Sequence, residues 1–284
     1  MSDARESNMA QDFEIEIRQR KQKYFLGSAH SHNHYELYYL QEGEIKYFIG
    51  DNIFLVKKGD VVLIPPHIIH KTVPCDDYCH TRILMNFTAD FVREYLAYNP
   101  RLLDFFKQPV VNMQKRKMGR VESILDSMLY EYANTGDIIM IKSLMGELLS
   151  LLNRAANADA QEGGAPCGDG LSRRILEIVR FINVHYPNEI NLETLSAKFY
   201  MSPTYLSRSF KKVMGITYSE YIKSVRINHS VHLLLNTPLN VTQIAMKTGF
   251  NSSNHFCKIF KDSMSISPLK YRKNYNKLNS RTVS

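Results

Sequence analysis

The sequence predicts an α+β protein with two domains: an N-terminal β-barrel with a helical hairpin, and a C-terminal domain made only of helices. Three observations support this fold class. Short β-branched runs with tight turns come first, amphipathic helices follow, and one pattern of about 33 residues then occurs twice. A chain of 284 residues is long enough for two ordinary domains. We expect one domain over 1–155, a flexible linker over 156–171 and a second domain over 172–284.

The first part of the N-terminal domain, from about Tyr24 to Phe87, is expected to be β-structure. The stretch KYFIGDNIFLVKKGDVVLIPP contains short apolar runs separated by the turn sequences GDN and KKGD. Several short strands joined by close turns are typical of a small barrel or sandwich.

Helices are expected after about Ala89. One helix ends at Pro100, and two longer helices flank the turn from Asn134 to Asp137. The second of these has a broad apolar stripe, which must be buried against the β-structure, a partner subunit or both. We expect part of the stripe to form a homodimer contact. The stripe consists of Ile138, Ile141, Leu144, Met145, Leu148, Leu149 and Leu152, and the dimer prediction concerns Ile141, Leu144, Met145, Leu148 and Leu152.

The two halves of the chain differ in charge. Residues 172–284 contain 17 Lys and Arg against five Asp and Glu, a net charge of +12. The rest contains 19 Lys and Arg against 23 Asp and Glu, a net charge of −4. This difference indicates a nucleic-acid-binding module joined to a domain of another kind. Between the halves, Asn157 to Gly170 is small, polar and Gly-rich, which is typical of a linker.

The repeat lies between Asn191 and Lys273. The first copy reads NLETLSAKFYMSPTYLSRSFKKVMGITYSEYIK, and the second reads NVTQIAMKTGFNSSNHFCKIFKDSMSISPLKYRK. Each copy predicts a short capped helix, a tight turn and a second helix with a polar, basic outer face. This is a helix-turn-helix present twice, and that motif commonly places its second helix in the major groove of DNA.

Caps and outer faces can be assigned in both copies. Asn191 and Ser202 are expected to cap the helices of the first copy, and Asn240 and Ser252 those of the second. Arginine can read guanine and asparagine can read adenine, whereas we expect Lys211 and Lys261 to contact phosphates. The outer faces consist of Thr204, Ser207, Arg208 and Lys211 in the first copy, and of Asn254, Cys257, Lys258 and Lys261 in the second.

A long helix is predicted between the copies, from Tyr218 to Asn236. Nineteen helical residues span roughly 28 Å. That length is close to the ~34 Å between successive major-groove openings on one face of B-DNA. One chain could therefore read two adjacent grooves.

The segment from about Arg173 to Tyr275 resembles the DNA-binding domain of the AraC/XylS family of transcription regulators. Four motifs show the resemblance: Arg226-x3-Ser230-x3-Leu234-Leu235, Ile244-Ala245-x3-Gly249-Phe250, Phe256-x3-Phe260-Lys261 and Pro268-x2-Tyr271-Arg272. Three positions depart from the family pattern, because Ser230 replaces Ala, Tyr218 replaces Pro and Ser265 replaces Gly. The resemblance implies that Thr204, Ser207, Arg208, Ser253, Asn254, Cys257 and Lys258 face the bases.

The N-terminal half resembles the cupin barrel. The motifs are His30-x-His32-x3-Glu36-x6-Gly43 and Gly59-x5-Pro65-x-His67-x2-His70. In metal-binding cupins the positions matching His30, His32, Glu36 and His70 would be ligands, and such a set suits Mn, Fe, Ni or Zn. Two positions depart from the pattern, since His67 stands where Gly is usual and Pro74 where Asn is usual.

We expect this cluster to bind a small polar effector, often a sugar in this family, with no metal and no cofactor. The effector-binding residues would be His30, His32, Glu36, Tyr38 and His70. Tyr38, Tyr47 and Phe48 could stack on the effector, although alternating aromatic residues are more often core. Cys75-x3-Cys79-His80 is a weaker metal candidate, and free thiols in a turn are the simpler interpretation.

The remaining features indicate a cytoplasmic protein. The four cysteines form no pattern of a secreted disulfide framework, and the polar N-terminus has no apolar signal segment. No apolar run is long enough to span a membrane. We therefore expect a transcription regulator that is not an enzyme. Its partners would be promoter DNA, a small-molecule effector, a second copy of the chain and, for an activator, RNA polymerase. Two alternatives stay open: a constitutive DNA-binding regulator with a vestigial barrel, and a metal-dependent cupin enzyme fused to a DNA-binding module.

Overall fold

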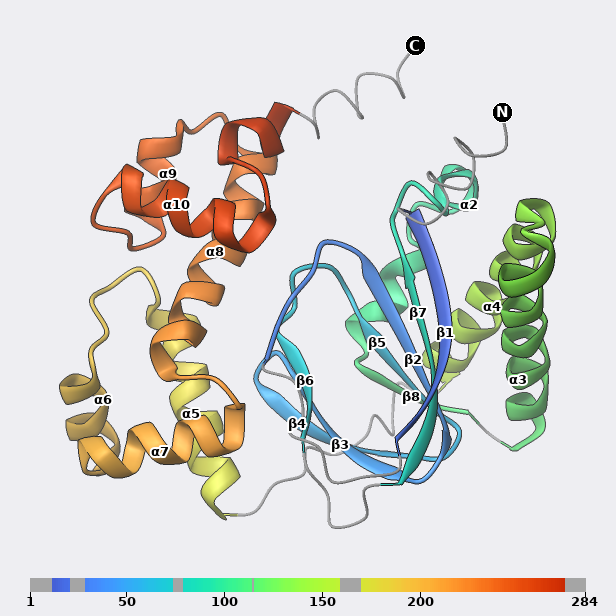
Figure 1. Cartoon of the computed structure of the whole chain (residues 1–284), viewed down its shortest axis with the longest axis horizontal. Coiled ribbons are helices and arrows are strands. Elements are labelled where there is room, and N and C mark those ends of the chain that lie inside the picture. Colours follow the sequence, from blue (N-terminus) through green and yellow to red (C-terminus); the bar gives the residue numbers. More distant parts are fainter. Residues whose placement is uncertain (1–11, 21–28, 74–78, 114, 159–169, 274–284) are drawn as a thin grey trace. The chain divides into compact units, whose positions relative to one another are not determined.

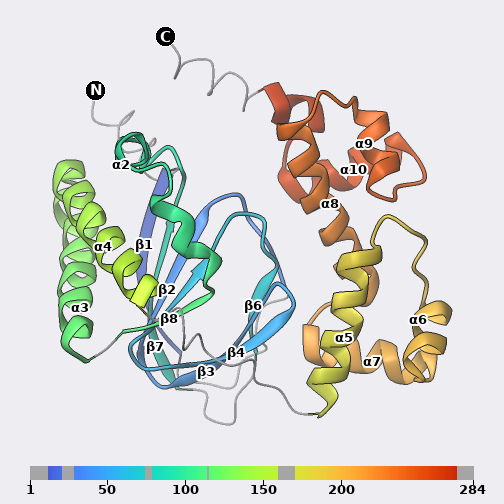
Figure 2. The same cartoon turned by 180° about the vertical axis from the view of Figure 1, so that it is seen from behind.

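A computed structural model of the chain describes residues 12–20, 29–73, 79–113, 115–158 and 170–273. The chain forms two compact units, and the main division falls between Cys167 and Gly168. The N-terminal unit is rich in β-sheet and the C-terminal unit is helical (Figures 1 and 2). The predicted α+β class is therefore confirmed. No helix of the described part of the chain is long and apolar enough to cross a bilayer.

The strands of the N-terminal unit form two separate sheets. The first has the order β1-β7-β2-β5-β8 and the second the order β4-β3-β6. The strands are β1 (Phe13–Arg20), β2 (Tyr35–Glu42), β3 (Glu44–Ile49), β4 (Asn52–Lys57), β5 (Asp60–Ile64), β6 (His70–Val73), β7 (His80–Phe87) and β8 (Val110–Asn112).

The sheets are not closed into a barrel, so the predicted barrel is wrong in this respect. Within the described strands, no hydrogen-bonded ladder joins an edge of one sheet to the other. The turns at Gly43 and Gly59 carry the chain across from one sheet to the other. Both glycines have a left-handed φ, of 89° and 88°. A Cβ on Gly43 would lie 2.5 Å from the carbonyl oxygen of Cys79, so this position requires glycine.

Strand β1 was not predicted, because the β-structure was expected to begin near Tyr24. It pairs with β7 along all eight residues, from Phe13 opposite Phe87 to Arg20 opposite His80. Its sequence FEIEIRQR alternates apolar and polar residues, and Phe13 and Ile15 are buried. This two-residue period is the signal that could have identified the strand.

The helical hairpin agrees with the prediction. Helix α3 (Lys115–Tyr130) continues into a short π-helical turn (Glu131–Thr135), and α4 (Ile138–Ala158) follows. The chain turns at Gly136, which has a left-handed φ of 63°. Before the hairpin come α2 (Arg93–Tyr98) and a 3₁₀ helix (Leu102–Lys107).

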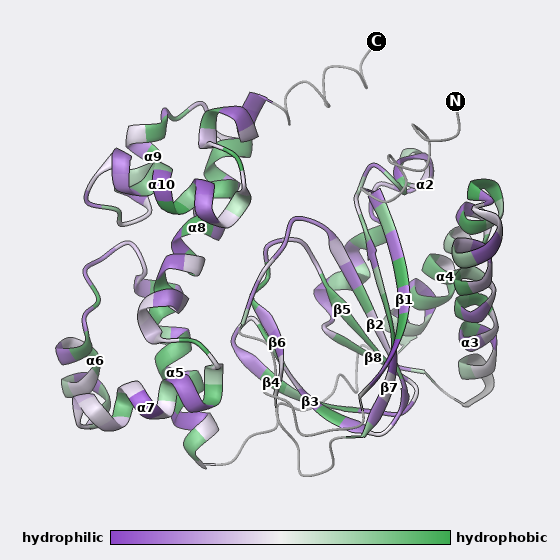
Figure 3. Ribbon diagram, viewed as in Figure 1, coloured by the Kyte–Doolittle hydropathy of each residue, from purple (hydrophilic) through white to green (hydrophobic). Residues whose placement is uncertain are grey.

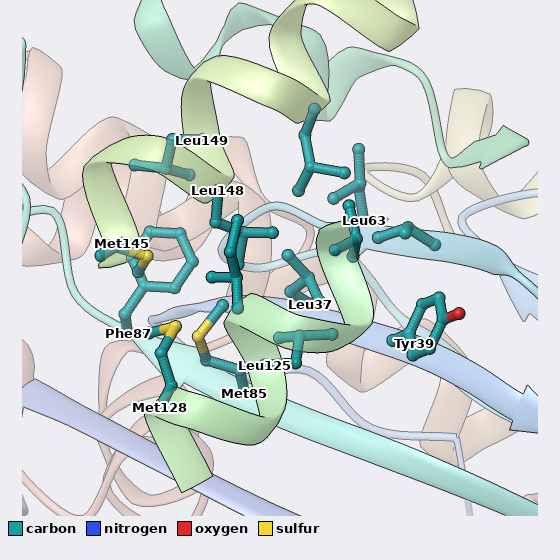
Figure 4. Close-up of a cluster of buried hydrophobic side chains, with 14 of the residues drawn as sticks. Leu37, Tyr39, Leu63, Met85, Phe87, Leu125, Met128, Met145, Leu148 and Leu149 are labelled. Carbon is teal, nitrogen blue, oxygen red and sulfur yellow. The ribbon is translucent and has the colours of Figure 1, made fainter. Parts of the chain in front are cut away.

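The apolar stripe on α4 lies in the core of its own chain. Ile141, Met145, Leu148 and Leu152 are fully buried there, and Leu144 packs against the same core. Figure 4 shows α4 side chains among those of α3 and the five-stranded sheet. The four fully buried residues therefore leave no surface for the predicted dimer contact. Leu144 is half-buried and Ile138, at the start of the stripe, is 39% exposed, so a contact that includes them stays a prediction.

The helices extend into the predicted linker from both sides. Helix α4 continues to Ala158, with Ala156 buried, and α5 (Gly170–His185) begins two residues before Ser172. The part of the linker from 159 to 169 lies outside the described residues.

The C-terminal unit contains the two predicted helix-turn-helix motifs. Capping boxes at Asn191 and Asn240, and side-chain caps at Ser202 and Ser252, match the predicted helix starts. The predicted nineteen-residue helix is α8, with the predicted bounds. The helices are α6 (Leu192–Phe199), α7 (Pro203–Met214), α8 (Tyr218–Asn236), α9 (Val241–Lys247) and α10 (Ser253–Met264).

Two departures from the family pattern have a physical explanation. The Ser230 side chain is buried, and its hydroxyl donates to the Arg226 carbonyl 2.6 Å away, so its polar atom is satisfied. Tyr218 is the first residue of α8, after the cap Thr217. Proline is favoured at that position but not required, because the N–H there has no partner within the helix.

The third departure supports a prediction about stability. Ser265 ends α10 in the left-handed conformation (φ 61°), where the equivalent residue after α7 is Gly215 (φ 72°). We expect Ser265→Gly to stabilise the C-terminal unit by roughly 1 kcal/mol, because glycine has no Cβ to strain at this φ. The reciprocal change Gly215→Ser should destabilise by a similar amount. Urea unfolding of both variants measures this, and a loss of stability in Ser265→Gly would contradict it.

Candidate functional site

Four polar side chains converge between the two sheets, and we call them the histidine–glutamate cluster: His32, Glu36, Tyr47 and His70. His32 donates from Nε2 to Glu36 Oε2 (3.1 Å), and the Tyr47 hydroxyl donates to Glu36 Oε1 (2.9 Å). His70 Nε2 lies 3.6 Å from Glu36 Oε2. Both carboxylate oxygens of Glu36 are therefore engaged by residues from other segments of the chain.

Backbone carbonyls orient the two imidazoles. His32 Nδ1 donates to the carbonyl of His34 (3.0 Å), and His70 Nδ1 donates to the carbonyl of Ile68 (2.8 Å). The bond between His32 and the Glu36 carboxylate joins two side chains that are mostly buried.

The environment keeps Glu36 ionised. Burial by itself raises the pKa of its carboxyl, but the hydrogen bonds and charges of His32 and His70 outweigh burial. The pKa of Glu36 therefore lies well below its ordinary value. Burial, followed by the charge of Glu36, raises the pKa of Tyr47 well above its ordinary value, so its hydroxyl keeps the proton that it donates.

The structure brings the predicted effector residues together to different degrees. Ligand atoms of His30, His32 and His70 all lie within 4.8 Å of one another. Tyr38 lies on β2 two residues after Glu36, and its buried ring packs edge-on against Tyr47. Phe48 is buried on strand β3 of the other sheet, next to Tyr47 in the sequence. Because successive side chains of a strand point to opposite faces, Phe48 points away from this cluster.

The donor set can bind either of two partners. Imidazole nitrogens and a carboxylate oxygen suit a divalent transition metal, and a donation from Nδ1 to a carbonyl is the usual way to orient metal-binding histidines. The same groups can accept and donate hydrogen bonds to the hydroxyls of a small polar molecule. Of the weaker candidate, Cys75 lies outside the described residues, whereas Cys79 is exposed and His80 is buried.

His67 explains why a glycine is usual in the second cupin motif. Its φ is 66°, in the left-handed region, and its N–H donates to the carbonyl of His32 (2.7 Å). This contact fixes the backbone of the loop next to the cluster. Burial lowers the pKa of His67 to about 4, with a smaller effect of the charge of His32.

This conformation and this pKa predict a pH-dependent gain in stability. His67→Gly should stabilise the N-terminal unit by about 1 kcal/mol at pH 7, through relief of left-handed strain. Between about pH 6.5 and pH 4, the His67 side chain binds a proton in the unfolded chain but not in the folded chain. The stability of the wild type therefore falls as pH drops through this window, and at pH 5 the variant should gain up to about 2 kcal/mol more. His67→Ala separates the two effects, because it removes the titration but keeps the strain. Urea unfolding at pH 7 and 5 measures both, and equal pH slopes in all three proteins would contradict the prediction.

The predicted outer face of α7 is mostly exposed. Thr204, Arg208 and Lys211 are exposed, and Ser207 is half-buried. The opposite face, with Leu206, Phe210 and Val213, is buried as predicted. Helix α7 is therefore amphipathic, and Figure 3 shows both hydrophilic and hydrophobic residues along it.

The second outer face differs in one residue. On α10, Asn254, Lys258 and Lys261 are exposed and Ser253 is half-buried. Cys257 is also half-buried, and its side chain packs against the core formed around Phe256 and Phe260. Its position therefore combines packing with the face that the resemblance assigns to base reading.

The sequence-based interpretation missed two residues next to the histidine–glutamate cluster. Arg82 and Asn86 on β7 face the same inter-sheet space, directly opposite Leu40 and Glu36 of β2. The role of Tyr47 as a donor to Glu36 was missed as well. The available signal was an arginine at an alternate position within the otherwise apolar strand HTRILMNF.

Comparison with known families covers most of the chain. A model of the AraC-like ligand binding domain matches residues 14–149. A model of the helix-turn-helix domain matches residues 195–274.

The chain is also similar to individual proteins. The uncharacterized HTH-type transcriptional regulator YijO of Escherichia coli K12 is 35% identical over 106 residues, which are 37% of this chain and 38% of that protein. The HTH-type transcriptional activator RhaS of Enterobacter sp. strain 638 is 24% identical over 249 residues, 86% of each chain. A crystal structure of ToxT from Vibrio cholerae superposes with a TM-score of 0.41 and 17% identity, covering 92% of this chain and 97% of that one.

Proposed function

Because this chain belongs to the AraC family of DNA-binding transcription regulators, we propose that it binds promoter DNA through α7 and α10 and responds to a small molecule bound in its N-terminal unit. One observation carries the DNA-binding part. Two helices with the same arrangement of buried core and exposed polar residues are joined by the nineteen residues of α8. That spacer supports binding to two adjacent major-groove segments.

The contacts divide by chemistry. Side chains that can hydrogen-bond to base edges specify the sequence, whereas lysines at the ends of the same faces bind phosphates. The base-contacting residues are Thr204, Ser207, Arg208, Ser253, Asn254, Cys257 and Lys258, and the phosphate-contacting residues are Lys211 and Lys261.

Selection from a pool of random DNA duplexes tests this function directly. The full chain should enrich a site with two conserved segments about one helical turn apart, about 10 base pairs between centres. Retention of duplexes without any enriched sequence would instead indicate binding through charge alone, and would contradict sequence-specific regulation.

For the N-terminal unit, the cluster of His30, His32, Glu36, Tyr38 and His70 supports binding of a small polar effector such as a sugar. Glu36 is ionised, and its Oε1, which accepts one hydrogen bond from Tyr47, has a second lone pair that can accept a hydrogen bond from an effector hydroxyl. Tyr38 and Tyr47 supply flat apolar surface beside it, which suits the face of a sugar ring.

Glu36→Gln should weaken effector binding at least tenfold, because a neutral amide forms weaker hydrogen bonds with hydroxyls than a carboxylate does. Thermal-shift titration of the full chain with a panel of neutral and acidic sugars measures this, since a ligand that binds only the folded state raises its stability. Glu42→Gln is the matched control, because Glu42 lies on the same strand but is exposed. Equal titrations in both variants would place the effector elsewhere.

Two alternatives lead to different results. A metalloenzyme would contain close to one metal ion per chain, lost in both His32→Ala and His70→Ala, and the geometry of the histidines supports testing for it by elemental analysis. A constitutive regulator would bind its DNA site equally with every compound in the panel. We favour the effector-responsive regulator, which is not an enzyme and acts in the cytoplasm as a homodimer, with RNA polymerase as a further partner if it activates transcription.

A further inference from the structure

Arg82 is a buried cation in the inter-sheet space. Only 6% of its surface is exposed. Its neighbours on β7, Ile83 and Met85, belong to the core on the helix side of the sheet, so Arg82 points to the opposite side by strand alternation. Its cross-strand partner Leu40 belongs to the inter-sheet core. The guanidinium lies 5.2 Å from the centre of the Tyr38 ring.

Within the described part of the chain, no carboxylate forms an ion pair with Arg82, and its buried Nε has no hydrogen-bond partner. Glu36, the acid of the same space, is already engaged by His32, His70 and Tyr47. A buried guanidinium without a counter-charge is strongly unfavourable, and arginines that are kept inside a protein are normally paired.

A second orphaned group lies on the same strand face. The buried Oδ1 of Asn86 has no hydrogen-bond partner among the described residues. Asn86 lies directly opposite Glu36. Arg82 lies four residues before Asn86 on β7, so the Cα atoms of these two residues are roughly 13 Å apart. The Arg82 guanidinium approaches the Tyr38 ring, which lies between these two levels of the sheet. The Tyr38 ring thus links Arg82 to the histidine–glutamate cluster, since its centre also lies 5.2 Å from the centre of the Tyr47 ring.

We propose that the effector is a polyhydroxylated carboxylic acid, a sugar acid, whose carboxylate pairs with Arg82 while its hydroxyls reach Glu36 and Asn86. This inference rests on the effector-binding function proposed above. The guanidinium fork matches a carboxylate in a two-bond contact, and the ring of Tyr38 covers the apolar face of the ligand.

Charge balance selects a carboxylate over a phosphate. One guanidinium compensates one negative charge, which is the charge of a carboxylate, whereas a phosphate monoester has about −1.5 to −2 at neutral pH. Lys71, the other buried cation of these strands, follows His70 in β6 and points to the opposite face of its strand.

Titration of the full chain with matched probes tests the ligand class. The panel pairs uronic and aldonic acids with their neutral sugars and with sugar phosphates, and thermal shift and calorimetry give the affinities. At least one sugar acid should bind, its neutral counterpart should bind at least tenfold more weakly, and Arg82→Met should lose about 10- to 100-fold in affinity for the acid. Arg18→Met is the control, because Arg18 is the exposed cross-strand neighbour of Arg82. Binding of neutral sugars or sugar phosphates only, or of no sugar acid, overturns the inference.

The stability of the ligand-free protein gives an independent result. If Arg82 is kept for a ligand, Arg82→Met should raise the melting temperature without ligand, because it removes an uncompensated buried charge. If Arg82 instead stabilises the fold, Arg82→Met should have a lower melting temperature than the wild type, and that result would overturn the inference. The duplex selection described above distinguishes failure of the sugar-acid inference from failure of the DNA-binding function. If the chain enriches a DNA site but binds no sugar acid, only the sugar-acid inference is rejected.

Discussion

Replacing Arg226 with methionine is expected to lower the free energy of unfolding of the C-terminal unit by about 3 kcal/mol. Arg226 lies on α8, and its guanidinium donates to the carbonyls of Tyr186 and Asn188, both at 2.9 Å. These carbonyls follow the end of α5 and lose charge-assisted partners in the variant. The guanidinium also lies 5.9 Å from the centre of the Phe250 ring, in the second helix-turn-helix.

The effect should extend to DNA binding. A Cβ on Gly249 would lie 2.7 Å from the carbonyl oxygen of Pro187 and 3.0 Å from Arg226 Cζ, so the turn of the second motif packs directly on this junction. Loss of Arg226 should therefore loosen the spacing of the two motifs. Arg272 forms the equivalent contacts with the carbonyls of Leu234 and Thr237, and Arg272→Met should behave similarly.

Urea unfolding and DNA-binding titrations measure these effects. Arg226→Lys is informative, because an ammonium cannot reproduce the two-carbonyl fork and should restore only part of the stability. Lys223→Met is the control, as an exposed cation of the same helix. A stability loss in Arg226→Met no larger than in Lys223→Met would show that the fork contributes nothing.

The second large effect concerns recognition of DNA. We expect Arg208→Ala to lose ~1–3 kcal/mol of binding to the specific site but little binding to scrambled DNA. Arg208 is exposed, one helical turn after Thr204 on α7, where an arginine can form two hydrogen bonds with guanine. Lys211→Ala should instead weaken binding to both sequences and lower the salt slope by about one, because it releases one phosphate contact.

Titrations of both variants on both DNAs, at several salt concentrations, distinguish the roles. Lys212→Ala provides a third exposed cation of the same helix, outside the predicted face. If Arg208→Ala weakened specific and scrambled binding equally, Arg208 would be a phosphate contact and the assignment of the α7 face would need to be revised.

Local rules were sufficient to predict the C-terminal unit. Asn191, Ser202, Asn240 and Ser252 cap helices where expected, because a cap depends on residues only three positions apart. The nineteen-residue bounds of α8 follow from the capping residue Thr217 and from Pro238 just beyond its end. The alternation of Leu206 and Phe210 with exposed polar residues likewise reflects a period of 3.6 residues that any helix must follow.

The N-terminal unit was less predictable. Its strands pair across long separations, as in β1 with β7, and the sequence does not say which edges remain open. The stripe on α4 shows the same limit: its apolar character required burial, but only the tertiary structure showed that the five-stranded sheet and α3 cover most of it.

The candidate site divides in the same way. The spacing of His30, His32, Glu36 and His70 was enough to predict that they lie together, because it resembles a known motif. Only the tertiary structure brought Tyr47, Arg82 and Asn86 to the same space, through strand pairing that no local pattern encodes. It also revealed that Arg82 has no ion pair among the described residues, because pairing of a buried ion depends on every side chain that surrounds it and not on the residues beside it in the sequence.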